Sequence, residues 1–375
     1  MFNLTDGLFA LAGLLLIVLV FGDVFQSIVV PHYRPTGIRI SPVLTSKVLW
    51  APFRMLIKRL PDEAAQTYLT IFAPAAMMTL LCCWVTVMTL GYACLLWAER
   101  SQIKPALNSL SEALYFSAAS VLTIGYGDVV AAEAISRLTV ICAAVSGIVL
   151  LAISVSFLFS VQGHFHTRET MAQVISSRVE HCANGAMFFQ LLRKVSSPTG
   201  LLEMCEKWII EVYQSHSAYP LLLYFRSRSS RAAWLVLFGA ILDAAAIAIT
   251  MNRQENRMLM TSIYENGSRA LAVFAVYLGR SPEPDEAIQD ASRYEEMFRA
   301  LGAKEPDQAA VTFTSLRARY YPELCALSDF FLIAVPSIGL IDMERLSDNF
   351  EATSVNRKHI PTPGMTSFFN LPAQK

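Results

Sequence analysis

The chain has 375 residues, of which 54% are hydrophobic and 16% charged, and its 30 basic residues balance its 30 acidic ones. Soluble domains average about 25% charged residues, so this composition, with a mean hydropathy of +0.44, predicts a membrane protein. The balanced charge excludes an overall basic footprint for nucleic acid, and the seven cysteines show no CxxC spacing of a zinc site.

Three apolar stretches are long enough to cross a bilayer, which takes about 20 residues. They run over residues 8–30, 68–98 and 138–162. The first stretch contains Asp23, which either makes a polar contact inside the membrane or lies near the inner interface. The second stretch exceeds the length that a bilayer needs, and Pro74 near its start is expected to kink it.

The loop between the first two spans is basic, and it carries Arg34, Arg39, Lys47, Arg54, Lys58 and Arg59. Basic loops stay on the cytoplasmic side, so this loop is expected to be cytoplasmic. With three spans, the N-terminus and the loop between the second and third spans then lie outside, and the C-terminal half of the chain is cytoplasmic.

The same loop has an amphipathic pattern, with apolar residues interleaved with the basic ones over residues 43–59. Such a pattern is typical of a basic helix lying on the inner membrane surface. It is equally typical of a connecting helix packed on a cytoplasmic domain. The sequence leaves both interpretations open.

The loop between the second and third spans is too apolar for an ordinary external loop. Residues 109–122, "SLSEALYFSAASVL", indicate a short helix, and Ser109 and Glu112 have the spacing of a capping box at its start. The helix is followed by "TIGYGD" at residues 123–128. Irregular backbone at membrane depth persists only when it is buried in protein or lines a polar pathway.

The residue types in this segment suit the coordination of a cation. Gly125 and Gly127 can adopt positive φ, so the backbone can alternate in conformation and aim successive carbonyls at one axis. Thr123 adds a hydroxyl at the inner end. Tyr126 is expected to pack against the preceding helix, and Asp128 to accept hydrogen bonds behind the loop. Neutral carbonyl dipoles suit a weakly hydrated monovalent ion.

The segment "EALYFSAASVLTIGYGD" resembles the pore helix and selectivity filter of potassium channels, and residues 68–163 resemble their prokaryotic two-helix pore unit. The resemblance implies that K+ is the transported ion, with no other cofactor. The sequence shows no nucleophile elbow, phosphate loop or metal triad, so no enzymatic activity is expected. The implied filter comprises Thr123, Ile124, Gly125, Tyr126 and Gly127, with K+ bound by the backbone carbonyls of Thr123, Ile124, Gly125 and Tyr126 and with support from Asp128 and Glu112.

Two further positions bear on this resemblance. Gly147 lies where the family has the hinge of its inner helix, but a glycine in a membrane span is as often a helix-packing site. Leu122 departs from the threonine that often precedes the filter, which affects the cavity side of the filter rather than the filter itself.

A single filter segment cannot surround an ion, because the carbonyl ring needs four. The expected assembly is therefore a homotetramer in the lipid bilayer of a bacterial-type inner membrane, conducting K+ passively. A membrane-anchored signalling or scaffold protein with a channel-like pore module is the alternative. The gating stimulus and an unidentified cytoplasmic ligand stay open.

The predicted fold is an all-α membrane protein with three transmembrane helices, a re-entrant pore helix and filter loop, and a mostly helical cytoplasmic domain. Residues 232–250 are long enough to span, but Asp243 at their centre favours a buried helix. The predicted organisation is a span at 1–36, a basic amphipathic linker at 37–67, a pore domain at 68–163, a helical domain at 164–359 and an irregular tail at 360–375.

Overall fold

The computed structural model describes residues 4–28, 40–179, 184–195, 197–227, 233–252, 254–280 and 291–333. These residues form helices joined by short connections, with one small antiparallel ribbon of β1 (Ile103–Lys104) and β2 (Val130–Ala131). This confirms the predicted helical class. The predicted tail at 360–375 and the last residues of the first predicted span lie outside the described residues.

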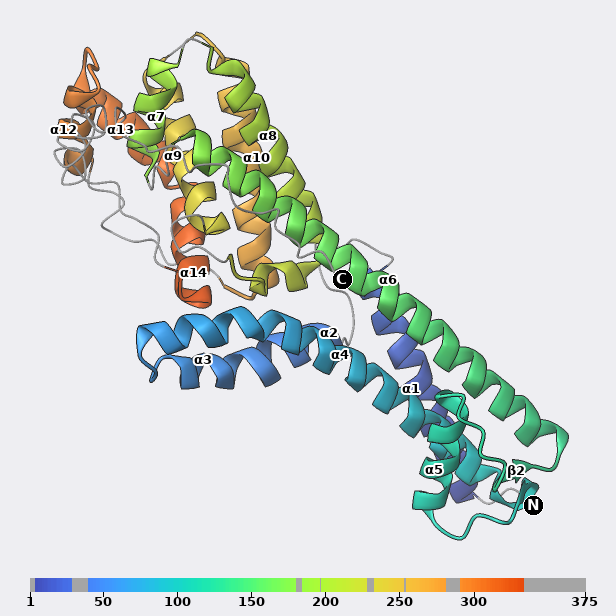
Figure 1. The fold of residues 1–375 in the computed structure, drawn as a ribbon. Coiled ribbons are helices and arrows are strands. Elements are labelled where there is room, and N and C mark those ends of the chain that lie inside the picture. Colours follow the sequence, from blue (N-terminus) through green and yellow to red (C-terminus); the bar gives the residue numbers. More distant parts are fainter. Residues whose placement is uncertain are drawn as a thin grey trace, which may run out of the picture.

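Within the described residues, three helices are long and apolar enough to cross a membrane. They are α1 (Leu4–Ile28), α4 (Asp62–Ala98) and α6 (Ala134–Arg178), and they run alongside one another in Figure 1. At about 1.5 Å per residue, the 45 residues of α6 extend about 68 Å. Because this is about twice the hydrocarbon thickness, α6 continues beyond the membrane into the C-terminal part of the molecule (Figure 1).

Helix α4 begins before the predicted span and changes direction along its length (Figure 1), as expected for a helix that contains Pro74. Its membrane part packs on α1 through small residues. A Cβ placed on Gly13 would lie 2.5 Å from the carbonyl oxygen of Gly91, so the two backbones approach closely. Such contacts drive helix association in lipid, where burial of apolar surface offers little gain.

The linker between the first two spans is helical from α2 (Ile40–Pro42) through the π-helical η1 (Val43–Trp50) to α3 (Ala51–Ile57). Trp50 is 3% exposed, and its ring lies 4.8 Å from that of Phe72 and 5.7 Å from that of Phe330. Arg54 forms an ion pair of 2.9 Å with Asp329. One side of the linker is therefore packed on the C-terminal region.

The C-terminal bundle is the set of helices between residues 185 and 331. It consists of α7 (Gly185–Lys194), α8 (Thr199–Ala218), the 3-10 turn η3 (Pro220–Tyr224), α9 (Trp234–Thr250), α10 (Arg257–Tyr277), α12 (Ser292–Ala300), α13 (Pro306–Arg317) and α14 (Tyr321–Phe331).

Helix α9 covers most of the apolar stretch at 232–250, which is long enough to be a fourth span. Its residues 234–248 are all buried, and α7, α10, α13 and α14 surround it. Asp243 in its centre accepts a hydrogen bond from Arg317 Nε at 3.0 Å, so its charge is compensated inside the bundle. The structure confirms the buried helix.

Candidate functional site: the pore module

The predicted re-entrant helix is α5 (Leu110–Val121); Ser109 caps it as the predicted capping box requires, whereas Glu112 binds the amide of Asn108, one residue before the cap. Ser109 Oγ accepts a hydrogen bond from the Glu112 amide at 3.3 Å, and Glu112 Oε2 accepts one from the Asn108 amide at 2.7 Å. Glu112 therefore fixes the start of α5, one helix length away from the filter loop. Deeper in the module, Ser117 Oγ donates to the Thr89 carbonyl at 2.7 Å and ties α5 to α4.

The loop after α5 alternates in backbone conformation. Thr123, Gly125 and Gly127 have φ of 55°, 62° and 81°, whereas the residues between them do not have positive φ. Glycine adopts this region freely, but a β-branched threonine there is an outlier that the surroundings must hold in place. The amides of Thr123 and Ile124 donate to carbonyls of α5, at 3.1 Å and 2.8 Å.

The carbonyls of the loop, unlike its first amides, take part in no backbone hydrogen bond within the described residues. Among the described residues, no amide donates a backbone hydrogen bond to the carbonyl oxygens of residues 123–126. The whole segment 122–128 is exposed in the single chain. A row of carbonyls without internal donors, at the depth of membrane helices, requires a polar partner.

Behind the loop, one aromatic residue of α5 connects to both of its expected supports. The Tyr115 ring is stacked on the Tyr126 ring, with centroids 6.4 Å apart and planes 5° apart. The Tyr115 hydroxyl donates to Asp128 Oδ2 at 2.8 Å. Tyr126 thus packs on α5 and Asp128 accepts a hydrogen bond behind the loop, as expected from the sequence, whereas the only signal of Tyr115 is its place in "EALY".

Gly147 lies where α6 crosses the C-terminal end of α5. A Cβ on Gly147 would overlap the carbonyl oxygen of Val121, so the helices touch through backbone at this point. The contact matches the packing interpretation of this glycine. One residue earlier, the hydroxyl groups of Ser146 and Tyr92 are 2.7 Å apart and connect α6 to α4.

Polar contacts join the spans at both ends. At one end, Arg100, which follows α4, forms an ion pair of 2.6 Å with Asp6 near the start of α1. At the opposite end, Asp23 is buried and accepts hydrogen bonds from Trp84 Nε1 at 2.8 Å and from the Ser41 amide at 3.1 Å. Asp23 thus makes a polar contact with α4 at the end of α1 where the linker begins.

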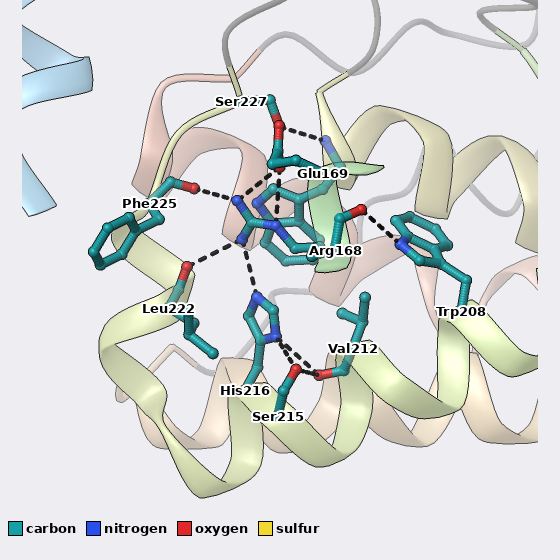
Figure 2. A network of polar contacts seen from close by, with 10 residues as sticks. Arg168, Glu169, Trp208, Val212, Ser215, His216, Leu222, Phe225 and Ser227 are labelled. Atoms are coloured by element: carbon teal, nitrogen blue, oxygen red, sulfur yellow. Dashed lines mark hydrogen bonds and ion pairs between the residues drawn. The ribbon is translucent and has the colours of Figure 1, made fainter. Parts of the chain in front are cut away.

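Helix α6 runs from the filter region into the C-terminal bundle, where its residue Arg168 lies in a network of polar contacts (Figure 2). Its side chain is 2% exposed. Nη1 donates to the Leu222 carbonyl at 3.1 Å, and Nη2 donates to the Phe225 carbonyl at 2.7 Å. Its own backbone carbonyl accepts from Trp208 Nε1 at 3.1 Å. The guanidinium therefore bonds to the turn that follows α8.

Two further side chains lie within hydrogen-bond distance of the guanidinium (Figure 2). Arg168 Nη2 lies 2.9 Å from Glu169 Oε1, and Nη1 lies 3.0 Å from Nε2 of His216. Burial and then the charge of Arg168 hold the pKa of His216 well below its ordinary value, so the imidazole is neutral. Nε2 then accepts from Arg168, and Nδ1 donates to the Val212 carbonyl at 2.9 Å. Nothing in the sequence pattern singled out this arginine.

Comparisons with known proteins agree with this geometry. Residues 79–162, which include most of α4, all of α5, the loop and the first part of α6, match the model of a family described as "Ion channel". Over 48 residues the chain is 38% identical to a protein of Methanocaldococcus jannaschii called "Hyperpolarization-activated voltage-gated potassium channel". That match covers 12% of this chain and 23% of the other protein. No solved structure matches the chain.

Two membrane-length helices with a re-entrant helix and loop between them, matched by an ion-channel family, define residues 79–162 as an ion-channel pore domain in a multi-pass membrane protein. The family that matches this region is one of ion channels. Within the class, the similar archaeal protein is a potassium channel, and the similarity extends over less than a quarter of its length.

Proposed function

We propose that the protein is a potassium-selective channel that conducts K+ passively as a homotetramer. The observation that carries the proposal is the filter loop itself. Positive φ at Thr123, Gly125 and Gly127 alternates along the loop, and the carbonyls of residues 123–126 lack internal backbone donors. Such carbonyls replace the hydration shell of a weakly hydrated monovalent cation. Gly127 and Asp128 complete the filter and its support.

The tetramer is proposed because the single chain leaves its functional surface uncovered. The filter segment 122–128 is exposed, and so is an apolar row along α6, namely Ile135, Leu138, Ile141, Val145, Ile148, Leu151, Val155 and Phe159. Four copies around one axis would close the carbonyl ring and cover part of this row. We further propose that the N-terminus and filter loop lie outside and the C-terminal bundle lies in the cytoplasm, because the linker is basic.

We also propose that the cytoplasmic bundle acts on a gate in α6. The same helix passes Gly147 beneath the filter and Arg168 inside the bundle, so displacement of the bundle would be transmitted along α6. Because Gly147 touches the end of α5, bending there would also disturb the base of the pore helix.

The direct test is ion flux from proteoliposomes that contain the purified full chain. We expect K+ flux that Na+ does not match. Gly125→Ala should abolish selective conduction, because φ of 62° is unfavourable for a residue with a Cβ. Equal Na+ flux in the natural protein, or natural flux in Gly125→Ala, would contradict the proposal.

A membrane-anchored signalling or scaffold protein is the second candidate, and the size of the C-terminal bundle with its own buried helix α9 favours it. Under this alternative the pore module is a sensor or anchor. Reconstituted protein that passes no ion, while its C-terminal bundle binds a partner, would support this candidate and exclude the channel.

A further inference from the structure

The linker of residues 40–60 has two different sides. One side packs on the C-terminal bundle through Trp50 and through the ion pair of Arg54 with Asp329. The other side exposes large apolar residues: Val48 is 55% exposed, Met55 is 69% exposed and Leu56 is 59% exposed. Exposed apolar side chains of this size at the end of membrane spans require a partner.

The charges of the linker are of one sign. Residues 40–61 contain no Asp or Glu. Lys47, Lys58 and Arg59 are exposed in the same segment as the apolar residues. An exposed apolar strip with basic residues beside it is complementary to a lipid surface that carries negative headgroups.

The geometry of the chain keeps this segment at the membrane. The linker follows span α1 and leads directly into α4, and Asp23 at the end of α1 binds the Ser41 amide at the start of the linker. Figure 1 shows the C-terminal bundle on one side of the layer formed by α3 and the first part of α4, while α1 and the rest of α4 extend from that layer away from the bundle. The side opposite the bundle therefore borders the bilayer.

We propose that the linker is an anionic-lipid-binding element whose exposed residues Val48, Met55 and Leu56 enter the bilayer surface while Lys47, Lys58 and Arg59 bind acidic headgroups. The other side of the linker holds the C-terminal bundle, so lipid charge sets the position of the bundle that acts on α6. This regulatory half rests on the proposed channel function, whereas the binding half does not.

The binding half is tested by tryptophan fluorescence in proteoliposomes whose lipids carry bromine in the acyl chains. Met55→Trp introduces a reporter into the linker, and Val311→Trp places a matched one on α13, where Val311 is 60% exposed. With the natural protein subtracted, we expect strong quenching at residue 55 and none at residue 311. Equal quenching at the two positions overturns the proposal. Absence of quenching at residue 55, as expected if a neighbouring subunit covers it, also overturns the proposal.

The charge recognition is tested with the same reporter in phosphatidylcholine alone and in phosphatidylcholine mixed with phosphatidylglycerol. Each basic side chain near an anionic surface raises partition about fivefold, so quenching should increase with phosphatidylglycerol and decrease with salt. Replacing Lys47, Lys58 and Arg59 by Gln should remove this increase. A control with the same change in charge replaces Lys207, Arg299 and Lys304, which are exposed on the bundle, and should leave it intact. Equal quenching with and without phosphatidylglycerol would overturn the proposed recognition of anionic lipid.

The regulatory half is tested by K+ flux in the two lipid mixtures. We expect flux to differ severalfold between them in the natural protein and in the bundle control, and to be the same in both for the linker variant. Flux that is insensitive to lipid in the natural protein overturns regulation. Absence of any K+ flux instead overturns the proposed function, and the quenching result stands independently of it.

Discussion

At the scale of single residues, two side chains make contacts that no local sequence pattern predicts. Tyr115 supports the filter loop by stacking on Tyr126 and by donating to Asp128. Arg168 joins α6 to the turn after α8 by bonds to two backbone carbonyls. The partners of Tyr115 lie in the loop that follows its helix, and the two carbonyls bound by Arg168 lie more than 50 residues further along the chain. Both roles therefore depend on the folded structure.

Tyr115→Phe should weaken the filter, because it keeps the ring stack but removes the donor to Asp128. We expect a lower K+ to Na+ permeability ratio and shorter openings in single-channel recordings. Tyr126→Phe is the matched control, since that ring keeps its stack while no hydrogen bond of its hydroxyl contributes to this contact. An unchanged permeability ratio in Tyr115→Phe would remove the support role from this residue.

Arg168→Met should destabilise the bundle by about 3–5 kcal/mol, because it leaves the buried carbonyls of Leu222 and Phe225 without their donor and Glu169 without its counter-charge. Thermal unfolding in detergent measures the change. Arg319→Met is the comparison: its pair with Glu265 is solvent exposed, so the expected loss is below about 1 kcal/mol. Similar losses in the two variants would argue against the importance of the Arg168 network.

The neutral state of His216 predicts a pH dependence of stability. Its pKa is lowered in the folded protein, so below the ordinary value of about 6.5 the unfolded chain binds a proton that the folded chain does not. Stability should be complete above that pH and decrease as the pH falls below it. His216→Gln should flatten this part of the curve of melting temperature against pH; an unchanged slope would assign the titration to other groups.

At the scale of elements, the helices of the pore module are positioned by close backbone contacts. Gly13 and Gly91 let α1 reach α4, and Gly147 lets α6 reach the end of α5. These glycines determine how closely the helices approach. A larger residue at any of them would clash with the neighbouring helix, which would have to move. Because packed helices rearrange poorly, such substitutions are costly.

Gly147→Ala is therefore expected to displace α5 from α6 and to destabilise the assembled protein by about 1–3 kcal/mol. Gly163→Ala in the same helix is the matched control, because a Cβ there meets nothing within 4 Å and alanine favours the helix. Loss of tetramer on native gels at a lower temperature measures the effect. Equal behaviour of the two variants would favour a flexible hinge at residue 147 over a packing contact.

At the scale of the whole molecule, the chain is a pore module linked to a bundle through one continuous helix and one packed linker. Helix α6 enters the bundle at Arg168, and Trp50 of the linker contacts α14 through Phe330. Trp50 also lies against Tyr224 of η3, the turn whose Leu222 carbonyl binds Arg168, so the two connections meet near this turn. The bundle is therefore placed to affect the pore without contacting the filter.

Ending the chain at residue 163 removes Arg168 and the bundle but leaves the filter and the glycine contacts. We expect single-channel recordings of this truncated protein to keep K+ selectivity and unitary conductance, with a changed open probability. The full chain in the same lipid is the control. Lost selectivity would show that the bundle is needed to assemble the pore, and an unchanged open probability would remove its regulatory role.

Much of the fold was predictable from the sequence because its signals are local. The three membrane-length helices follow from apolar length, and the cap that Ser109 provides for α5 follows from residue spacing. The pore domain follows from "TIGYGD" after a short apolar helix, because irregular backbone in a membrane has few uses. Glu112, however, supports the start of α5 and not the filter loop directly, which spacing alone did not distinguish.

The sequence by itself determined the class of this protein, since hydrophobic length and glycine placement act within a few residues of chain. Only the tertiary structure decided that α9 is buried, because Asp243 is compensated by Arg317, which lies far along the chain. The structure also showed which side of the linker is occupied, and that Arg168 connects pore and bundle. Those outcomes depend on partners brought together by packing, and no local pattern contains them.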